Sequence, residues 1–201
     1  MKIYVIHYTP LKDRKKNIIL QIENLNYTDY EFIENFDRDV LTLDQISKFR
    51  NISKSEMSIF LKHIEALRRF LETNLENCCI TEDDSIFDPD LPNKLDQLLK
   101  ELNGNINYIV FCSSCCNIHY QGQITPDRLL YPSPGTRGTC FYLISRQAAQ
   151  FIYNDFLEDT QISVPIDHWM NVKKKFAHTF YSEPVLVTQG SETGLFKSSL
   201  R

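Results

Sequence analysis

The feature of this chain that most constrains its fold is the alternation of short apolar runs with segments of helical periodicity. Apolar runs typical of strands occupy residues 3–6, 30–33, 78–81, 108–112 and 140–144, and residues 176–181 have the pattern of a late strand. Apolar residues recur at helical spacing over residues 11–25, 57–71, 95–102 and 149–156. This order predicts an α/β fold with a mostly parallel sheet flanked by helices and joined by right-handed crossovers.

Local signals refine three parts of this prediction. Ser53 and Glu56 form a capping-box pattern directly before an apolar helical face, which predicts a helix start there. Ser145 follows an apolar run and precedes a helical one, so we expect it to cap the later helix. Residues 121–138 are rich in Gly and Pro, and we interpret them as a mobile lid.

Three consecutive carboxylates, Glu82, Asp83 and Asp84, end the apolar run at residues 78–81. Strand ends border the ligand crevice in open α/β sheets, and side chains alternate along extended backbone. Glu82 and Asp84 are therefore expected to share one face, with Asp83 pointing away. Two hard oxygen donors suit Mg²⁺ or Mn²⁺. Taken alone, an acidic solvated turn explains the cluster better, since carboxylates are common surface residues.

Bulk composition limits the class of protein without choosing the function. With 201 residues and 42% hydrophobic content, the chain is expected to form a single domain over residues 1–201. A net charge of −4 argues against nucleic acid as a partner. The opening apolar stretch is too short for a signal peptide or a transmembrane segment, which predicts a cytoplasmic location.

The chain has six cysteines, and Cys112 and Cys115 form a Cys-x-x-Cys pair. A structural zinc site needs four ligands, and no second Cys-x-x-Cys or His-x-x-x-His pair accompanies this one. We therefore expect reduced, packed thiols in place of a zinc site or disulfides.

Six motifs in one order carry a resemblance to a known family. They are Y-V-I-H-Y-T-P-L-K-D-R at residues 4–14, S-K-S-E-M-S-I-F-L-K-H at 53–63, I-T-E-D-D at 80–84, G-T-C-F-Y-L-I-S-R-Q-A-A at 138–149, P-I-D-H-W at 165–169 and V-L-V-T-Q-G-S-E-T at 185–193. Together they resemble glycosyltransferase family 25, the group of lipopolysaccharide and procollagen sugar transferases. The resemblance spans most of the chain and favours a functional role for the acidic cluster.

The resemblance implies a GT-A-like, Rossmann-like fold. It also implies transfer of a sugar, a hexose such as galactose or glucose, from a UDP-sugar donor to a hydroxyl acceptor on a glycan or protein, with inversion. The implied cofactor is Mn²⁺ or Mg²⁺, held by Glu82 and Asp84. Such an ion would neutralise the charge that develops on the departing diphosphate.

Inversion in one displacement needs a base that takes the acceptor's proton. Asp167 in P-I-D-H-W is the preferred candidate, and Glu192, where the family segment has Asp, is the alternative. For Asp167, a helix N-terminal carboxylate stabilised by the helix dipole is an equally good explanation. The acceptor is expected to contact His168, Trp169 and Gln189, with Trp169 as a surface for stacking against a sugar ring.

The resemblance places the donor near eight residues: His7, Tyr8, Arg14, Glu56, His63, Asp83, Gly138 and Thr139. Arg14 is suited to clamp a phosphate, although a solvated helix face explains it without the family match. His7 stands where the family usually has Asn, and Asp83 is expected to orient its loop or to reach the donor ribose. A capping role explains Glu56, a packed core histidine explains His63, and a turn explains Gly138 with Thr139.

Two other functions remain open. A non-catalytic module that binds a sugar or nucleotide would fold normally without binding metal. A metal phosphohydrolase ranks lower, since two-metal hydrolases draw carboxylates and histidines from several strand ends and this chain has one dense acidic cluster.

Overall fold

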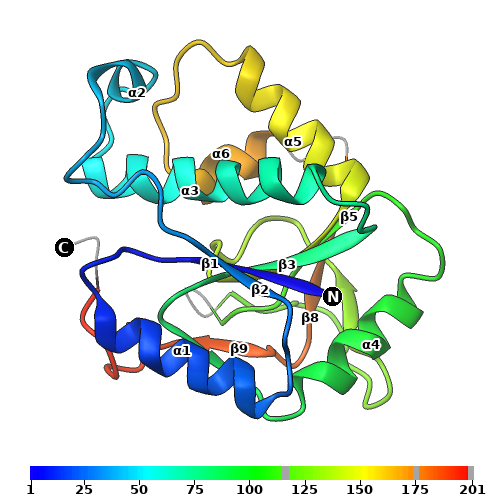
Figure 1. The fold of residues 1–201 in the computed structure, drawn as a ribbon. Coiled ribbons are helices and arrows are strands. Elements are labelled where there is room, and N and C mark those ends of the chain that lie inside the picture. The colour runs from blue at the N-terminus through cyan, green and yellow to red at the C-terminus, as the bar shows by residue number, and fades with distance from the viewer. Residues whose placement is uncertain (115–117, 174–176, 199–201) are drawn as a thin grey trace.

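The computed structural model describes residues 1–114, 118–173 and 177–198 (Figure 1). Within these ranges, seven strands form one sheet in the order β2-β1-β3-β7-β5-β8-β6. Their bounds are Lys2–Ile6 for β1, Tyr30–Ile33 for β2, Asn77–Glu82 for β3, Tyr108–Phe111 for β5, Leu130–Pro132 for β6, Phe141–Ser145 for β7 and His178–Ser182 for β8. A two-stranded ribbon pairs β4 (Ser85–Phe87) with β9 (Val187–Gln189).

The sheet is mostly parallel, as predicted. Strands β2, β1, β3, β5 and β8 run in one direction, while β7 and the edge strand β6 run against their neighbours. The central position of β7 was not expected, because its apolar run looks like that of a parallel strand. Its reversed direction brings the start of β7 to the edge where β3 ends, since Thr81 near the end of β3 pairs with Phe141 at the start of β7.

Helices cover both faces of the sheet (Figure 1). One face carries α3 (Lys54–Leu71), α5 (Arg146–Glu158) and α6 (Ile166–Lys173), with the short α2 (Leu43–Ser47) beyond them. The other carries α1 (Lys12–Asn24), α4 (Leu91–Glu101) and the β4–β9 ribbon. Two apolar cores result, one on each face.

Strand β1 shows how one apolar run serves both cores. Tyr4 and Ile6 pack on the α3 side, while Ile3 and Val5 pack on the α1 and α4 side. Alternating side chains of a strand covered on both faces are all buried, which explains a continuous apolar run in place of an apolar–polar alternation.

The predicted cap of α3 is confirmed. The Glu56 amide donates to Ser53 Oγ over 3.2 Å, and the Glu56 carboxylate accepts from the Ser53 amide over 2.6 Å. This closes the capping box and directs the apolar face of α3 onto the sheet.

The interpretation of residues 121–138 as a lid is wrong over much of that segment. Leu130–Pro132 form β6, which pairs with β8, and Leu129, Leu130 and Tyr131 are buried. The segment therefore contains a sheet edge, a feature that depends on pairing with a strand about fifty residues later.

The described cysteines are packed, as expected. Cys78, Cys79, Cys112 and Cys140 are free and buried, and burial raises the pKa of the Cys78 and Cys79 thiols well above the ordinary range. Cys115, Cys116 and Phe176 lie outside the described residues. None of the helices in the described ranges is long and apolar enough to cross a membrane.

Candidate active site

A cavity of about 530 Å³ opens beside the end of β3. Eight residues singled out from the sequence line it: Glu56, Glu82, Gly138, Thr139, Asp167, His168, Gln189 and Glu192. They come from α3, β3, the approach to β7, the start of α6 and the segment that begins at the end of β9. The fold thus gathers residues that are far apart in the sequence around one space.

Glu82 is the last residue of β3 and faces this cavity. Its amide donates to the Cys140 carbonyl over 2.8 Å, which ties it to the start of β7. Thr139 Oγ1 donates to Glu82 Oε1 over 3.1 Å, and His63 Nε2 lies 3.7 Å from the same oxygen. The carboxylate is therefore held by Thr139, and the His63 ring lies near it without a hydrogen bond.

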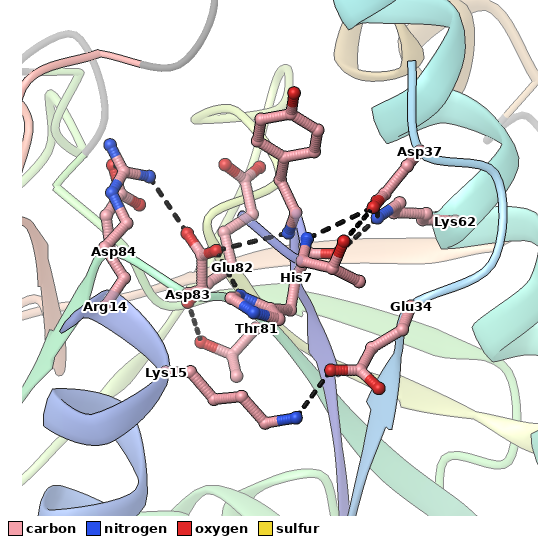
Figure 2. A network of polar contacts seen from close by, with 12 residues as sticks. His7, Arg14, Lys15, Glu34, Asp37, Lys62, Thr81, Glu82, Asp83 and Asp84 are labelled. Atoms are coloured by element: carbon pink, nitrogen blue, oxygen red, sulfur yellow. Dashed lines mark hydrogen bonds and ion pairs between the residues drawn. The ribbon is translucent and has the colours of Figure 1, made fainter. Parts of the chain in front are cut away.

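The strand alternation expected for the three carboxylates stops at Glu82, because Asp83 and Asp84 form a turn before β4 begins. Glu82 lines the cavity, whereas neither Asp83 nor Asp84 is among the lining residues, and Asp83 borders the small hollow next to it. Its Oδ2 accepts from His7 Nδ1 over 2.7 Å, and its Oδ1 accepts from Arg14 over 2.9 Å (Figure 2). These contacts favour the expected loop-orienting role of Asp83 over contact with a ribose.

Asp84 is buried beneath the segment that follows β9. The Gly190 amide donates to its backbone oxygen over 2.7 Å, and Arg14 Nη1 lies 3.7 Å from Oδ2. Burial raises the pKa of the Asp84 carboxyl to about 6, with help from the charges of Glu82 and Asp83, against the opposing effects of Ser191 and Arg14. Among the described residues, Asp84 Oδ1 has no hydrogen-bond partner.

A Cβ at position 190 would lie 2.7 Å from the Asp84 oxygen and 2.7 Å from the Phe196 ring. Glycine is thus required for the close approach of this segment to the acidic turn. Nearby, the β4–β9 pairing sets Gln189 opposite Ser85, and the Glu192 amide donates to the Gln189 carbonyl over 3.0 Å.

Arg14 is 5% exposed. Besides Asp83, its guanidinium donates to the Lys197 carbonyl, and it lies 5.4 Å from the centre of the Phe196 ring. The solvated-face explanation for Arg14 is therefore wrong.

Lys62 and Asp37 belong to the same polar network, and the sequence reasoning missed both (Figure 2). Lys62 is 1% exposed, and its ammonium donates to the His7 carbonyl and to Asp37. Burial lowers the pKa of Lys62, while the charge and hydrogen bond of Asp37 act to raise it. The signal in the sequence that could have identified Lys62 was its position among the apolar residues of S-I-F-L-K-H.

His63 is fully buried and stacks on Tyr142, with 5.7 Å between the ring centres. Its Nδ1 lies 3.1 Å from the Tyr142 hydroxyl, and its Nε2 faces Glu82. This placement agrees with a packed core histidine that also touches the carboxylate in the cavity.

The start of α6 supplies Asp167 and His168 to the cavity. Asp167 Oδ1 accepts from the His168 amide over 2.9 Å, which is the helix N-terminal contact that the sequence left open as an alternative role. Trp169 corrects the expectation of a sugar-stacking surface. Its ring is 4% exposed, lies 5.2 Å from Phe60 and donates through Nε1 to Asp159 over 2.6 Å. It belongs to the core, because the helix turns it away from the cavity.

Gly138 and Thr139 approach the cavity on a loop in which Gly138 has a positive φ of 88°. Arg137, another residue missed from the sequence, fixes this loop. It is fully buried and donates to the Ser182 carbonyl over 2.9 Å and to the Glu183 carboxylate.

Tyr8 and three other donor candidates lie next to the main cavity. A small hollow lined by His7, Tyr8, Arg14 and Asp83 also includes Glu82, which borders both spaces. The Tyr8 hydroxyl donates to Asp39, and the Arg38 guanidinium lies 4.5 Å from the centre of the Tyr8 ring.

Glu82 and Asp84 are the residues that the sequence predicts as ligands of a divalent cation. Within the described ranges, no three or more His, Cys, Asp or Glu side chains are grouped as a metal site. Mg²⁺ and Mn²⁺ nevertheless commonly use only one or two carboxylates, with water and substrate phosphates as the other ligands. The buried Asp84 oxygen without a hydrogen-bond partner fits that kind of donor.

Comparison with solved structures finds similar folds. The crystal structure of A197 from STIV has a TM-score of 0.51 and 14% identity, covering 90% of this chain and 80% of that chain. A putative glucose-1-phosphate thymidylyltransferase from Bacillus anthracis, in complex with a sucrose, has a TM-score of 0.45 and 12% identity, covering 90% and 86%. The inositol-1-phosphate CTP transferase from T. maritima has a TM-score of 0.42 and 12% identity, covering 94% and 69%.

No curated protein matches the chain. The model of glycosyltransferase family 25, described as an LPS biosynthesis protein family, matches residues 1–170. The match covers five of the six motifs, and the Q-G-S-E-T segment lies beyond it. The chain therefore belongs to glycosyltransferase family 25.

Proposed function

We propose that this glycosyltransferase moves a hexose from a UDP-sugar to a hydroxyl of a glycan or protein, with inversion at the anomeric carbon. One observation carries the proposal: a single cavity is lined by Glu82 on one side and by both base candidates, Asp167 and Glu192, elsewhere on its wall. A donor-side carboxylate and an acceptor-side base are the two groups that a single displacement needs.

Glu82 and Asp84 would hold Mn²⁺ or Mg²⁺, which supplies a positive charge for the departing diphosphate. The protein contributes the position of those carboxylates. Thr139 Oγ1 donates to the Glu82 carboxylate, and the Gly190 amide donates to the backbone oxygen of Asp84. His7 and Tyr8 border the adjoining hollow, so the nucleotide end of the donor is assigned to that side of Glu82.

Asp167 is our preferred base. Its Oδ1 accepts from the His168 amide, its Oδ2 lies 4.0 Å from His168 Nε2, and its side chain is 32% exposed at the cavity, where Oδ2 would take the proton. Glu192 is the alternative base. His168 and Gln189 line the same wall and are assigned to the acceptor.

Thermal unfolding with UDP-, GDP- and CMP-sugars, each with and without Mn²⁺, tests donor and cation together. A ligand at 100 times its dissociation constant adds about 2.7 kcal/mol of stability. We expect a Mn²⁺-dependent rise in Tm with a UDP-sugar that is lost in Glu82→Gln. Asp13→Asn removes a carboxylate that is 97% exposed and serves as the matched control.

Transfer is measured as UDP release with an acceptor panel, and the anomeric configuration of the product by NMR. Asp167→Asn is expected to lower kcat by about 10² to 10⁴ while the UDP-sugar still raises Tm. An equal loss in Glu192→Gln alone would assign the base to Glu192. A folded protein that gains no stability from any donor would support the non-catalytic alternative.

A further inference from the structure

Arg14 makes contacts that a phosphate clamp does not need. Nη1 donates to Asp83 in the acidic turn, and Nη2 donates to the Lys197 carbonyl near the other end of the chain. The Phe196 ring lies against the same guanidinium. Arg14 therefore joins two segments that are more than a hundred residues apart in the sequence.

The second of these segments, residues 190–198, is called the strap here. The strap folds back on itself, with the Phe196 amide donating to the Gly190 carbonyl over 3.1 Å and Thr193 Oγ1 donating to the same oxygen over 3.1 Å. It is attached to the acidic turn through the Gly190 amide and the Asp84 carbonyl. Three of its residues, Ser191, Glu192 and Ser198, line the cavity.

We propose that Arg14 is a positioning residue that fastens the strap to the acidic turn and thereby sets one wall of the cavity. The planar guanidinium can donate in two directions at fixed angles, and here one direction serves a carboxylate and the other a backbone carbonyl. With both Nη atoms engaged and 5% of the residue exposed, Arg14 acts on the substrate through the strap.

The contacts of the strap with the acidic turn and with Arg14 position the strap residues that line the cavity. Ser191 and Glu192 are anchored from one end by Gly190 on Asp84, and Ser198 is anchored by its neighbour Lys197 on Arg14. Loss of the second anchor removes the contact between Lys197 and Arg14, while contacts near the start of the strap remain, among them the Gly190 amide on Asp84 and Ser114 Oγ 3.5 Å from Glu192 Oε2. A role of these residues in sugar transfer rests on the proposed function. The attachment of the strap to the acidic turn through Arg14 does not.

Amide hydrogen exchange in the ligand-free protein tests the fastening directly. Arg14→Lys keeps the positive charge but loses the fork that reaches two partners. We expect the Phe196 amide to exchange at least about tenfold faster, as loss of one charge-assisted hydrogen bond implies. Phe196→Ala, which keeps Arg14 and its charge, is expected to speed exchange at the Gly190 amide as well.

Arg68→Lys on α3 is the matched control, because the Arg68 guanidinium also donates to two partners, Glu65 and Glu72. It should leave exchange in the strap unchanged. UDP affinity separates the two roles of Arg14. A positioning role predicts that Arg14→Lys and Phe196→Ala weaken UDP binding by similar factors, whereas a clamp predicts weakening in Arg14→Lys alone.

Unchanged exchange at Gly190 and Phe196 in folded Arg14→Lys would overturn the proposal. If neither the native protein nor the variants bind UDP, the proposed donor fails, and the exchange rates still decide whether Arg14 fastens the strap.

Discussion

At the scale of single residues, the acidic turn holds a carboxyl group in surroundings that favour its protonated form. The pKa of Asp84 rises from an ordinary 3.8 to about 6, chiefly because the group is buried and secondly because Glu82 lies near. A buried carboxylate that repels its neighbours costs stability, and such a cost is common where charges are kept for binding.

Asp84→Asn should therefore stabilise the metal-free protein at neutral pH. The pKa is higher in the folded state than in the unfolded one, so wild-type stability falls as pH rises from about 4 to 6 and stays reduced above that window. We expect the advantage of Asp84→Asn to be larger at pH 7.5 than at pH 4 by about 2 kcal/mol. Urea unfolding with EDTA at both pH values measures it. An advantage that does not change with pH would contradict this assignment.

Eight of the predicted residues line one cavity, but the sequence did not predict the direction of every side chain in the acidic turn. Glu82 faces the cavity as expected, but the turn after β3 redirects Asp83 toward His7 and Arg14. Where a strand ends is decided by its partners, here the pairing of Glu82 with Ile6 of β1. Sequence spacing alone does not contain that information.

At the scale of elements, two serine caps with the same local chemistry have different surroundings. Ser53 is exposed and caps α3, whereas Ser145 is 2% exposed and caps α5 directly after β7. Ser145 Oγ accepts from the Ala148 amide over 3.2 Å and from the Tyr108 amide at the start of β5 over 3.0 Å. It thus satisfies one helix donor and one strand donor.

Ser145→Ala should cost more than Ser53→Ala. Loss of an exposed cap typically costs about 1 kcal/mol, and Ser145→Ala in addition leaves a buried strand amide unsatisfied, for a total of about 2 to 4 kcal/mol. Equilibrium urea unfolding of the two variants gives the comparison, each serving as the other's control. Equal losses would mean that the Tyr108 contact contributes nothing.

Elements defined by local signals were the ones that the sequence predicted well. The caps of α3 and α5 depend on residues three apart, and the structure confirms both. The β4–β9 ribbon and β6 were missed, because strands of three residues carry little periodicity and depend on partners far along the chain.

At the scale of the whole molecule, the sheet separates two apolar cores but belongs to both. The single tryptophan, Trp169, lies in the core beneath α3, and Leu98 of α4 lies in the other. Strands β1, β3 and β7 contribute side chains to each core. We therefore expect one cooperative unfolding transition.

Leu98→Ala should lower stability by about 2 to 5 kcal/mol, as should Ile64→Ala in the core that contains Trp169. Tryptophan fluorescence and far-UV circular dichroism are expected to report the same urea midpoint for each variant. A fluorescence midpoint that stays at the wild-type value in Leu98→Ala would show that the two cores unfold separately.

The family motifs indicated that residues from five regions of the chain meet at one site. They did not indicate the buried contacts inside that site. Lys62 and Asp37 were missed because a buried ion pair is recognised only when both partners are brought together. Trp169 was assigned to the surface by its neighbours in sequence, whereas the direction of α6 places it against Phe60.

Because β7 runs against its neighbours, its two ends lie at opposite edges of the sheet and should differ in how well they tolerate sequence changes. The segment that enters β7 borders the cavity, while the residue that leaves it begins a buried cap at the opposite end of the strand. Substitution of Thr139 would therefore change the wall of the cavity without touching α5, whereas an insertion before Gly138 would displace the fully buried Arg137. The entrance to β7 thus tolerates changes of side chain at the cavity better than changes of length, and its exit tolerates neither, because Ser145 there is 2% exposed and caps α5.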